Sequence, residues 1–578
     1  MNKQIEISNL VLDELETGLQ DLEAAKHDWA KTGVKRRIEI LSEIKTALIS
    51  VAEGWATTAA EKKLIPEGSP LAGEEWISGP YALISACNGL IETLSKIEGK
   101  SFLDDLPKRT LPNGQLVLKL TPHSIWDHLL LSGIKAEVWM KPEINRENLK
   151  ENAAVIYDQP EGEREGKVAL VLGAGNIASI APLDAFQKLF IENQVVMLKM
   201  NPVNDYLTTY LKAALKPLID EDALRIVKGD GVVGEHLVNH KLVEEIHITG
   251  AGATHDAIVW GTGKTGAKNK KNGKVLNPRK ITSELGAVCP TIVVPGPWSA
   301  ADIRFQAEQI ATQKIHNSGF NCVACQTLIM PQEWEHGGKL LETLNSVMSE
   351  YGKRGQYYPG TDERLAKFTE NAGNTQSVER GSFPDLVITE INDENQDWLC
   401  NNEIFAPALS VKHLQAKNSE AFLREAISFA NESLYGTLGA NIVIHPSTIR
   451  EIGKEKFEEI LTDLKYGAIA INTWTGLAFL LTVCPWGGYP NATLEDVGSG
   501  IGTVHNTFML ENTERAVVSA PWRPFPRGLL SGQFTMLPKP PWFVTNRRQE
   551  QVSKLFTHFE YKPSLLKLPR IFMNALIG

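Results

Sequence analysis

The sequence predicts an α/β fold with more than one domain. After Gly166, short runs of β-branched and aliphatic residues alternate with segments of helical spacing, as in the strand candidates 168–172 and 195–198 and the helix candidate 181–192. Such alternation is typical of a parallel sheet that is covered by helices on both faces. The length of 578 residues also exceeds what a single hydrophobic core usually supports.

Different patterns precede this region. Apolar residues recur at helical spacing between residues 11 and 49, which predicts helices for the first hundred residues. Apolar and polar residues alternate within residues 109–145, which predicts a small antiparallel sheet.

The strand series continues beyond residue 200. Strands are expected at residues 225–227, 245–249 and 291–294, and a helix is expected at 207–219. A second α/β region follows over residues 298–471. The lysine-rich stretch 264–274 contains two glycines, and we interpret it as an exposed hairpin tip.

The C-terminal part has a different composition. Residues 520–546 are rich in proline and aromatic residues, so a continuous helix is excluded and an extended segment that lies over the body is expected. Residues 511–578 carry ten lysines and arginines against four acids, whereas the whole chain has a formal net charge of −10. Two interpretations remain: an arm that wraps a neighbouring subunit, which we favour, and a peripheral membrane contact.

Composition excludes several classes of function. An acidic chain lacks the basic surface that nucleic-acid binding needs, so we expect no nucleic-acid partner. Six cysteines are too few for a disulfide scaffold, which indicates reduced thiols and a cytoplasmic location. No signal peptide or membrane-spanning run is evident. His236 and His240 have a metal-ligand spacing without an evident third ligand, so we expect no metal site.

A glycine-rich segment follows the strand candidate 168–172. Gly173-Ala-Gly175 begins a G-x-G-x-x-A pattern, which is typical of a loop that binds a dinucleotide pyrophosphate. The acidic residue that should close the next strand is missing, because that strand ends in Lys199. We therefore expect a nucleotide site with a different geometry.

Four segments resemble the signatures of the aldehyde dehydrogenase superfamily and occur in the same order. They are residues 175–199, Ser283-Glu-Leu-Gly286, Asn317-Ser-Gly-Phe-Asn-Cys-Val-Ala324 and Glu403-Ile-Phe-Ala-Pro407. The resemblance extends over about residues 20–505 and implies a Rossmann-type cofactor domain, an α/β catalytic domain and a small oligomerisation sheet. The implied division is 1–295 for the N-terminal helices and cofactor domain, with oligomerisation strands in 109–145, then 296–475 for the catalytic domain, 476–510 for a return segment and 511–578 for an extension.

The resemblance also implies catalytic roles. Cys322 is identified as the nucleophile, Glu284 as the base that activates water, and Asn176 together with the Cys322 amide as the oxyanion hole. These residue types suit aldehyde oxidation, because a carbonyl carbon releases hydride readily only after a nucleophile has converted it into a tetrahedral alkoxide. The thioester that remains then needs an activated water.

A nicotinamide cofactor is implied as well. Lys199, Gly250, Ala251, Glu403 and Phe405 occupy the positions that bind NAD or NADP in the family. Pro202 stands where the family often has a glutamate that grips the adenosine ribose and repels a 2′-phosphate. We therefore favour NADP slightly over NAD.

The function predicted from these residues is oxidation of an apolar aldehyde, aliphatic or aromatic, to its carboxylate by a homo-oligomeric enzyme. The apolar substrate is expected because residues 474–484, which match the family's substrate entrance, contain no charge. Two alternatives remain: a fatty acyl-CoA reductase that forms an acyl-cysteine and uses NADPH, and a catalytically inactive superfamily member that serves as a binding protein.

Overall fold

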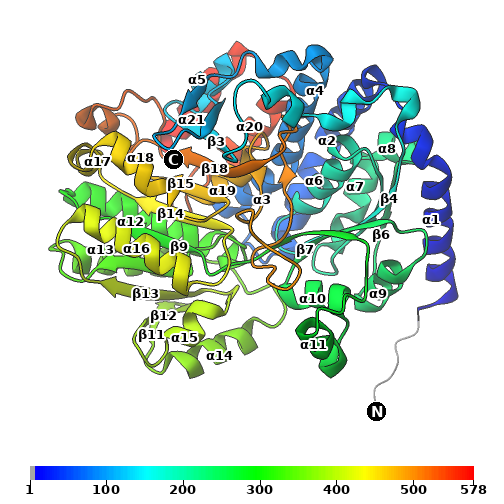
Figure 1. The fold of residues 1–578 in the computed structure, drawn as a ribbon. Coiled ribbons are helices and arrows are strands. Elements are labelled where there is room, and N and C mark those ends of the chain that lie inside the picture. Colours follow the sequence, from blue (N-terminus) through cyan, green and yellow to red (C-terminus); the bar gives the residue numbers. More distant parts are fainter. Residues whose placement is uncertain (1–6) are drawn as a thin grey trace.

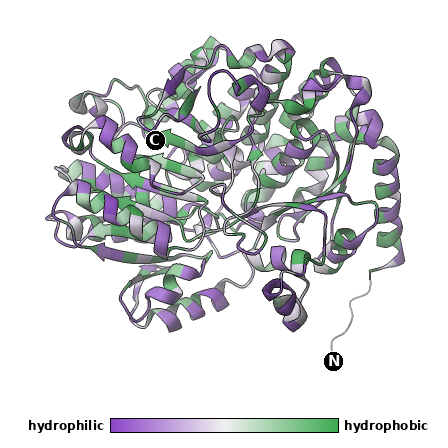
Figure 2. Cartoon of the chain, in the orientation of Figure 1, coloured by the Kyte–Doolittle hydropathy of each residue, from purple (hydrophilic) through white to green (hydrophobic). Residues whose placement is uncertain are grey.

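The computed structural model describes residues 7–578 and contains three sheets, of eleven, five and two strands (Figure 1). Residues 1–6, at the start of the segment where we expected no signal peptide, lie outside the described residues. Figure 2 shows hydrophobic residues along the central strands and hydrophilic residues on outer helices such as α14 and α11. Within residues 7–578, no helix has the length and apolarity that crossing a bilayer requires.

The five-stranded sheet is entirely parallel, as predicted. Its order is β6-β5-β4-β7-β8, with bounds Leu224–Val227, Val195–Lys199, Val168–Leu172, Glu245–Gly250 and Lys280–Leu285. The strands are almost completely buried, which explains their runs of valine, isoleucine and leucine. The connecting helices are α6 (Ile180–Phe186), α7 (Thr208–Ala214), α8 (Lys216–Asp220), α9 (Gly231–Asn239), α10 (Gly252–Trp260) and α11 (Gly263–Lys271).

The N-terminal region is helical, as the periodicity predicted. It comprises α1 (Asn9–Ala30), α2 (Val34–Lys62), α3 (Gly73–Trp76) and α4 (Ala82–Ser95). Helix α1 packs on β4, β5 and β6 through Leu15, Leu19 and Leu22, so it covers one face of the five-stranded sheet.

The eleven-stranded sheet has a parallel centre and antiparallel ends. Its order is β1-β2-β3-β18-β15-β14-β9-β10-β13-β12-β11. The strands are Lys108–Thr110, Leu116–Thr121, Lys135–Met140, Thr513–Ser519, Ala468–Ile471, Gly439–Val443, Pro290–Val293, Thr327–Pro331, Ala408–Leu414, Phe383–Glu390 and Gln376–Arg380 in that order. The remaining helices are α5 (Ile125–Leu130), α12 (Ala300–Ile315), α13 (Gly337–Glu350), α14 (Thr361–Ala372), α15 (Gln396–Asn401), α16 (Ser419–Ser433), α17 (Pro446–Ile452), α18 (Lys454–Thr462), α19 (Thr475–Leu480), α20 (Gln549–Tyr561) and α21 (Leu568–Ile577). The short strands β16 (Pro485–Trp486) and β17 (Val504–His505) form the third sheet.

The structure differs from the prediction at three places. The strands within 109–145 do not form a separate small sheet, because β3 pairs with β18 and β18 pairs with β15 of the same chain. Strand β9 belongs to the large sheet, since it pairs with β10 and β14, although it lies within the range 1–295. The lysine-rich stretch is not a hairpin tip but the helix α11, in which the Lys270 ammonium pairs with Asp256 of α10 at 2.8 Å.

The C-terminal part packs on its own chain. Residues 520–548 are mostly irregular, as the proline content predicted, and Trp522, Trp542 and Phe543 are buried in the body. These aromatic residues are therefore not available to wrap a neighbouring subunit. The range 511–578 also includes β18, a strand inside the large sheet.

Candidate active site

Two cavities meet at the predicted nucleophile. A cavity of about 790 Å³ lies along the five-stranded sheet, and a smaller one of about 50 Å³ lies among mostly apolar side chains from several parts of the chain. Asn176, Ile180 and Cys322 line both cavities. Cys322 is thus placed where the two cavities adjoin.

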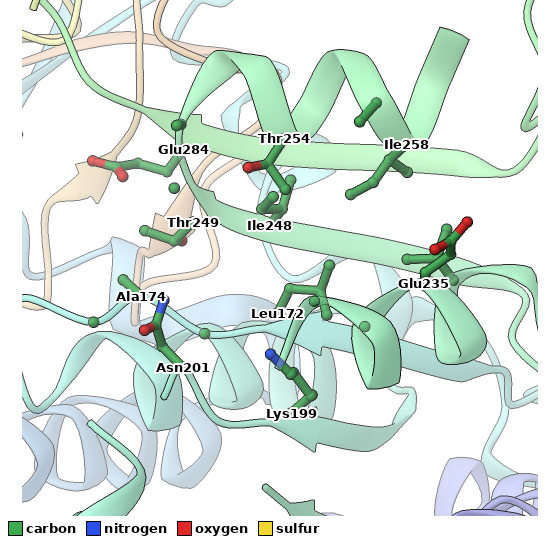
Figure 3. Close-up of a pocket in the computed structure, with 18 of the residues that line it drawn as sticks. Leu172, Ala174, Lys199, Asn201, Glu235, Ile248, Thr249, Thr254, Ile258 and Glu284 are labelled. Atoms are coloured by element: carbon green, nitrogen blue, oxygen red, sulfur yellow. The ribbon is translucent and has the colours of Figure 1, made fainter. Parts of the chain in front are cut away.

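The parallel strands bring the predicted cofactor residues together. Gly173–Asn176 follow β4, Lys199 ends β5, Gly250 ends β7 and Glu284 is near the end of β8, so all lie at the carboxyl edge of one sheet (Figure 3). Ligands of open α/β sheets bind at this edge. Cys322 and Glu403 instead come just before β10 and β13 of the large sheet. The larger cavity therefore lies between the carboxyl ends of one sheet and the amino ends of the other.

Glu284 and Cys322 contact each other. The Glu284 carboxyl accepts a hydrogen bond from Trp486 Nε1 at 3.0 Å and is hydrogen-bonded to the Cys322 side chain. Burial raises the pKa of Glu284 to about 7. Burial, together with the neighbouring Glu284 charge, raises the pKa of the Cys322 thiol well above its usual value. Glu284 is therefore the group beside Cys322 that can take the proton of its thiol.

Asn176 is held against the loop that carries Cys322. The Asn176 side-chain Nδ2 donates to the Phe320 carbonyl at 3.0 Å. The Asn176 backbone carbonyl accepts from Asn317 Nδ2 and from the Tyr357 hydroxyl, both at 3.2 Å. A side-chain amide has two N–H groups, so Nδ2 retains one donor for a substrate oxygen.

The nucleophile loop has an unusual backbone. Helix α12 ends at Ile315, and Asn317, Ser318 and Gly319 follow with φ values of 52°, 55° and 79°. A Cβ at residue 319 would lie 2.9 Å from the Ala406 carbonyl oxygen, so this position requires glycine. The Asn317 N–H donates to Glu74 Oε2 at 3.1 Å, and this hydrogen bond holds the turn against α3. Non-glycine residues in the left-handed region are typical of functional sites.

Glu403 and Phe405 both line the larger cavity. The Glu403 carboxyl lies directly over Gly286, where any Cβ would collide with it. Burial, and to a smaller extent the charge of Glu284, raises the pKa of Glu403 to about 8. Phe405 has a φ of 47° and packs on Tyr358, with ring centroids 5.0 Å apart.

Sequence reasoning missed three residues of this site. Tyr358 and Arg364 line the larger cavity, and Trp486 positions the Glu284 carboxyl. Only the motif around Trp486 carried a signal, since the sequence also resembles the family weakly at residues 485–488.

The larger cavity fits a dinucleotide. Gly250, Ala251 and Thr254 line the cavity at the start of α10. The N-cap residue of this helix makes no side-chain capping bond, so the free N–H groups of its first turn suit a phosphate. Lys199 is buried in the same cavity, and burial lowers the pKa of its ammonium against the opposing charge of Asp230. Within residues 7–578 this ammonium makes no hydrogen bond or ion pair. An ammonium without a protein partner suits a ribose hydroxyl or a phosphate.

In the part of the chain that the structure describes, no group of His, Cys, Asp or Glu residues is arranged to hold a metal ion. The Nε2 atoms of His236 and His240 instead lie 3.5 and 3.1 Å from the Glu16 carboxylate on α1.

Comparisons with known proteins agree with these features. The model of the aldehyde dehydrogenase family matches residues 179–356. A geranial dehydrogenase of Castellaniella defragrans is 23% identical over 251 residues, which cover 39% of this chain and 46% of that protein. An N-succinylglutamate 5-semialdehyde dehydrogenase of Caulobacter vibrioides is 30% identical over 131 residues, 22% of this chain and 24% of that protein. The matches thus span less than half of either curated relative.

The fold was also compared with solved structures. The NADP-dependent glyceraldehyde-3-phosphate dehydrogenase from Bacillus halodurans, crystallised with NADP, superposes with a TM-score of 0.56 at 18% identity, covering 88% of this chain and 91% of that chain. The family model over residues 179–356 and the curated relatives point to the aldehyde dehydrogenase superfamily, and the solved structure shows that this chain has the same fold.

Proposed function

We propose that the protein oxidises an aldehyde to the carboxylate with NAD⁺ or NADP⁺. The observation that carries this proposal is the position of Cys322, which lines both the larger cavity and the apolar cavity and contacts the buried Glu284 carboxyl. An aldehyde in the smaller cavity would present its carbonyl carbon to the thiol.

The residues support two steps. In the first, Cys322 Sγ bonds to the carbonyl carbon while the thiol proton passes to Glu284, and the resulting alkoxide accepts hydrogen bonds from Asn176 Nδ2 and the Cys322 amide. A bound oxidised nicotinamide supplies the hydride acceptor. Glu284 then releases the thiol proton to solvent. In the second step, the Glu284 carboxylate takes a proton from water, the hydroxide adds to the thioester carbon, and the C–S bond breaks to release the acid while the Cys322 sulfur takes the proton back from Glu284.

The smaller cavity supports an apolar substrate. Ile77, Ile177, Trp474, Phe479 and Leu480 line it, and three of these belong to or adjoin the segment 474–484 for which a substrate-facing role was expected. Apolar walls with few polar groups are typical of small-molecule sites.

The cofactor preference remains a proposal. Lys199 favours NADP, because its ammonium has no partner among residues 7–578 and Pro202 offers no carboxylate. Glu235, which the sequence analysis did not single out, lines the same cavity and opposes a 2′-phosphate by charge (Figure 3). We propose that NADP is accepted and that Glu235 limits the preference.

A direct assay tests the proposed oxidation. The absorbance of reduced nicotinamide should rise when the protein, an aldehyde and NAD⁺ or NADP⁺ are combined, and Cys322→Ala should abolish the rise. Cys400→Ala is the matched control, because Cys400 is buried but lines neither cavity. A Cys322→Ala variant as active as the parent would contradict the role of Cys322, and a parent that oxidises no aldehyde would favour a binding protein.

The acyl-CoA reductase alternative predicts a different outcome. A buried base beside the nucleophile favours hydrolysis of the thioester, which transfer from coenzyme A does not need. Consumption of NADPH with an acyl-CoA, at a rate exceeding that of aldehyde oxidation, would establish the alternative instead.

We also propose that the C-terminal end contacts an anionic membrane surface. Leu565, Leu566, Met573, Leu576 and Ile577 are exposed on or next to α21. Lys562 and Arg570 are exposed beside them, an arrangement typical of interfacial helices. Co-sedimentation with phosphatidylserine vesicles but not phosphatidylcholine vesicles, reduced by Leu566→Asp, is expected. Self-association through this patch with no vesicle binding would contradict the membrane proposal.

The cytoplasmic location and the homo-oligomeric state remain predictions. Light scattering measures the oligomeric state.

A further inference from the structure

The C-terminal extension forms part of the smaller cavity. Trp542 and Gln549 line it together with Cys322 and Asn176, although both lie beyond residue 505, where the family resemblance ends. The extension thus supplies a wall of the pocket in which the proposed function places the aldehyde.

This wall is fixed to the helix that leads into the nucleophile loop. Thr545 Oγ1 donates to Glu308 Oε2 on α12 at 2.9 Å, and Lys539 Nζ lies 3.1 Å from the same oxygen. The Val544 N–H donates to Thr312 Oγ1 at 3.2 Å. Residues 539–549 are therefore anchored to α12, so the position of Gln549 is determined relative to Cys322.

Helix α20 begins at Gln549 and packs closely on α3. A Cβ on Gly73 would lie 2.5 Å from the carbonyl carbon and oxygen of Gln549, so only glycine permits this contact. The next residue, Glu74, also lines the smaller cavity. The close approach holds the Gln549 side chain near the α3 end of the pocket.

Gln549 carries an amide without a partner. Its side chain is 1% exposed, and neither Nε2 nor Oε1 has a hydrogen-bond partner among the described residues. Glu74 Oε1 is likewise unpaired, while Glu74 Oε2 binds the Asn317 N–H and the buried Arg354 guanidinium. Leaving a buried polar group unpaired is costly, and such groups usually have a ligand or an ordered water.

The charges near Glu74 indicate which ligand group fits. Burial raises the pKa of Glu74, but the charges of Arg354 and His316 outweigh it and hold the pKa below its usual range. The carboxylate charge is thus already balanced by Arg354, so a cationic ligand group gains little there and a carboxylate is repelled. A neutral hydroxyl can donate to Glu74 Oε1 and accept from Gln549 Nε2.

We propose that Gln549 and Glu74 recognise a hydroxyl group at the end of the substrate distant from the aldehyde. The substrate class is therefore a hydroxyaldehyde with an apolar body, and Gln549 is a specificity-determining residue contributed by the extension. This inference rests on the proposed aldehyde oxidation for its reaction, but the binding of the hydroxyl does not depend on turnover.

Two matched substrate pairs test the inference. In each pair a methyl group replaces the hydroxyl: 4-hydroxybenzaldehyde against 4-methylbenzaldehyde, and 6-hydroxyhexanal against heptanal. We expect the ratio of kcat/KM values, hydroxyl over methyl, to fall at least about tenfold in Gln549→Met, because a site built to bind a hydroxyl discriminates strongly against its absence. Gln551→Met is the control, since Gln551 lies on the exposed side of the same helix and should leave the ratio unchanged. An equal ratio in the parent and Gln549→Met, for both pairs, would overturn the inference.

Calorimetric binding to Cys322→Ala separates this inference from the proposed function. Tighter binding of the hydroxyl compound, abolished by adding Gln549→Met, supports recognition even if the parent oxidises no aldehyde. Equal binding of the two members of each pair overturns the inference, while oxidation by the parent would still support the proposed function.

Discussion

Replacing Glu284 with glutamine should stabilise the protein at alkaline pH. Burial raises the pKa of Glu284 to about 7, whereas a carboxyl in an unfolded chain titrates near 4.5. The folded state therefore binds this proton more tightly, so stability falls as the pH rises from about 4.5 to about 7 and stays lower above that range. A glutamine carries no charge and keeps the acceptor for Trp486 Nε1.

The magnitude follows from the pKa shift. A difference of about 2.5 pKa units corresponds to about 3 kcal/mol. For a chain of 578 residues the unfolding entropy is about 1.2 kcal/mol/K, so the melting temperature should rise by about 3 °C.

Thermal unfolding at two pH values is the appropriate assay. The difference in melting temperature between Glu284→Gln and the parent should be near zero close to pH 4.5 and about 3 °C close to pH 8.5. Glu370→Gln, on the exposed surface of α14, is the matched control and should show no such change. A difference independent of pH, or a destabilised variant at alkaline pH, would refute the reasoning about burial of this carboxyl.

Three further predictions concern the rest of the site. The aldehyde-oxidising rate of the parent should increase with pH through an apparent pKa near 7, as the Glu284 carboxylate forms, and a flat profile would contradict its role as base. Gly286→Ala should abolish cofactor-dependent activity, because the added methyl collides with the Glu403 carboxyl; an active variant would show that Glu403 moves freely. Glu235→Gln should raise the ratio of kcat/KM with NADP⁺ to that with NAD⁺ several-fold, measured by steady-state kinetics, and an unchanged ratio would place the ribose elsewhere.

Much of the site could be predicted from the sequence. Local patterns specify the parallel strands, and the loops after such strands converge at one edge, which brings Asn176, Lys199 and Glu284 to one cavity. Cys322 was predicted as the nucleophile from the motif at 317–324, and the turn at 317–319 within that motif has a left-handed backbone.

Other features depend on contacts between distant parts of the chain. Trp486 reaches Glu284 across about 200 residues of sequence, and Gln549 reaches the pocket from beyond the family-like region. Nothing local distinguishes these residues from packing residues. The lysine-rich helix α11 was mistaken for a hairpin tip because two glycines suggested a turn, whereas Gly266 is buried and a Cβ there would collide with Gly261.

The position of β18 also constrains the order in which the large sheet can form. Strand β18 lies between β3 and β15, so residues 108–140 and residues 290–471 cannot join until residue 519 has been synthesised. Until then β3 and β15 each have an unpaired edge, and such edges promote aggregation. During translation the edge of β3 is therefore open from about residue 140 and that of β15 from about residue 471. We expect ribosome-bound chains that end between residues 471 and 513 to depend on chaperones.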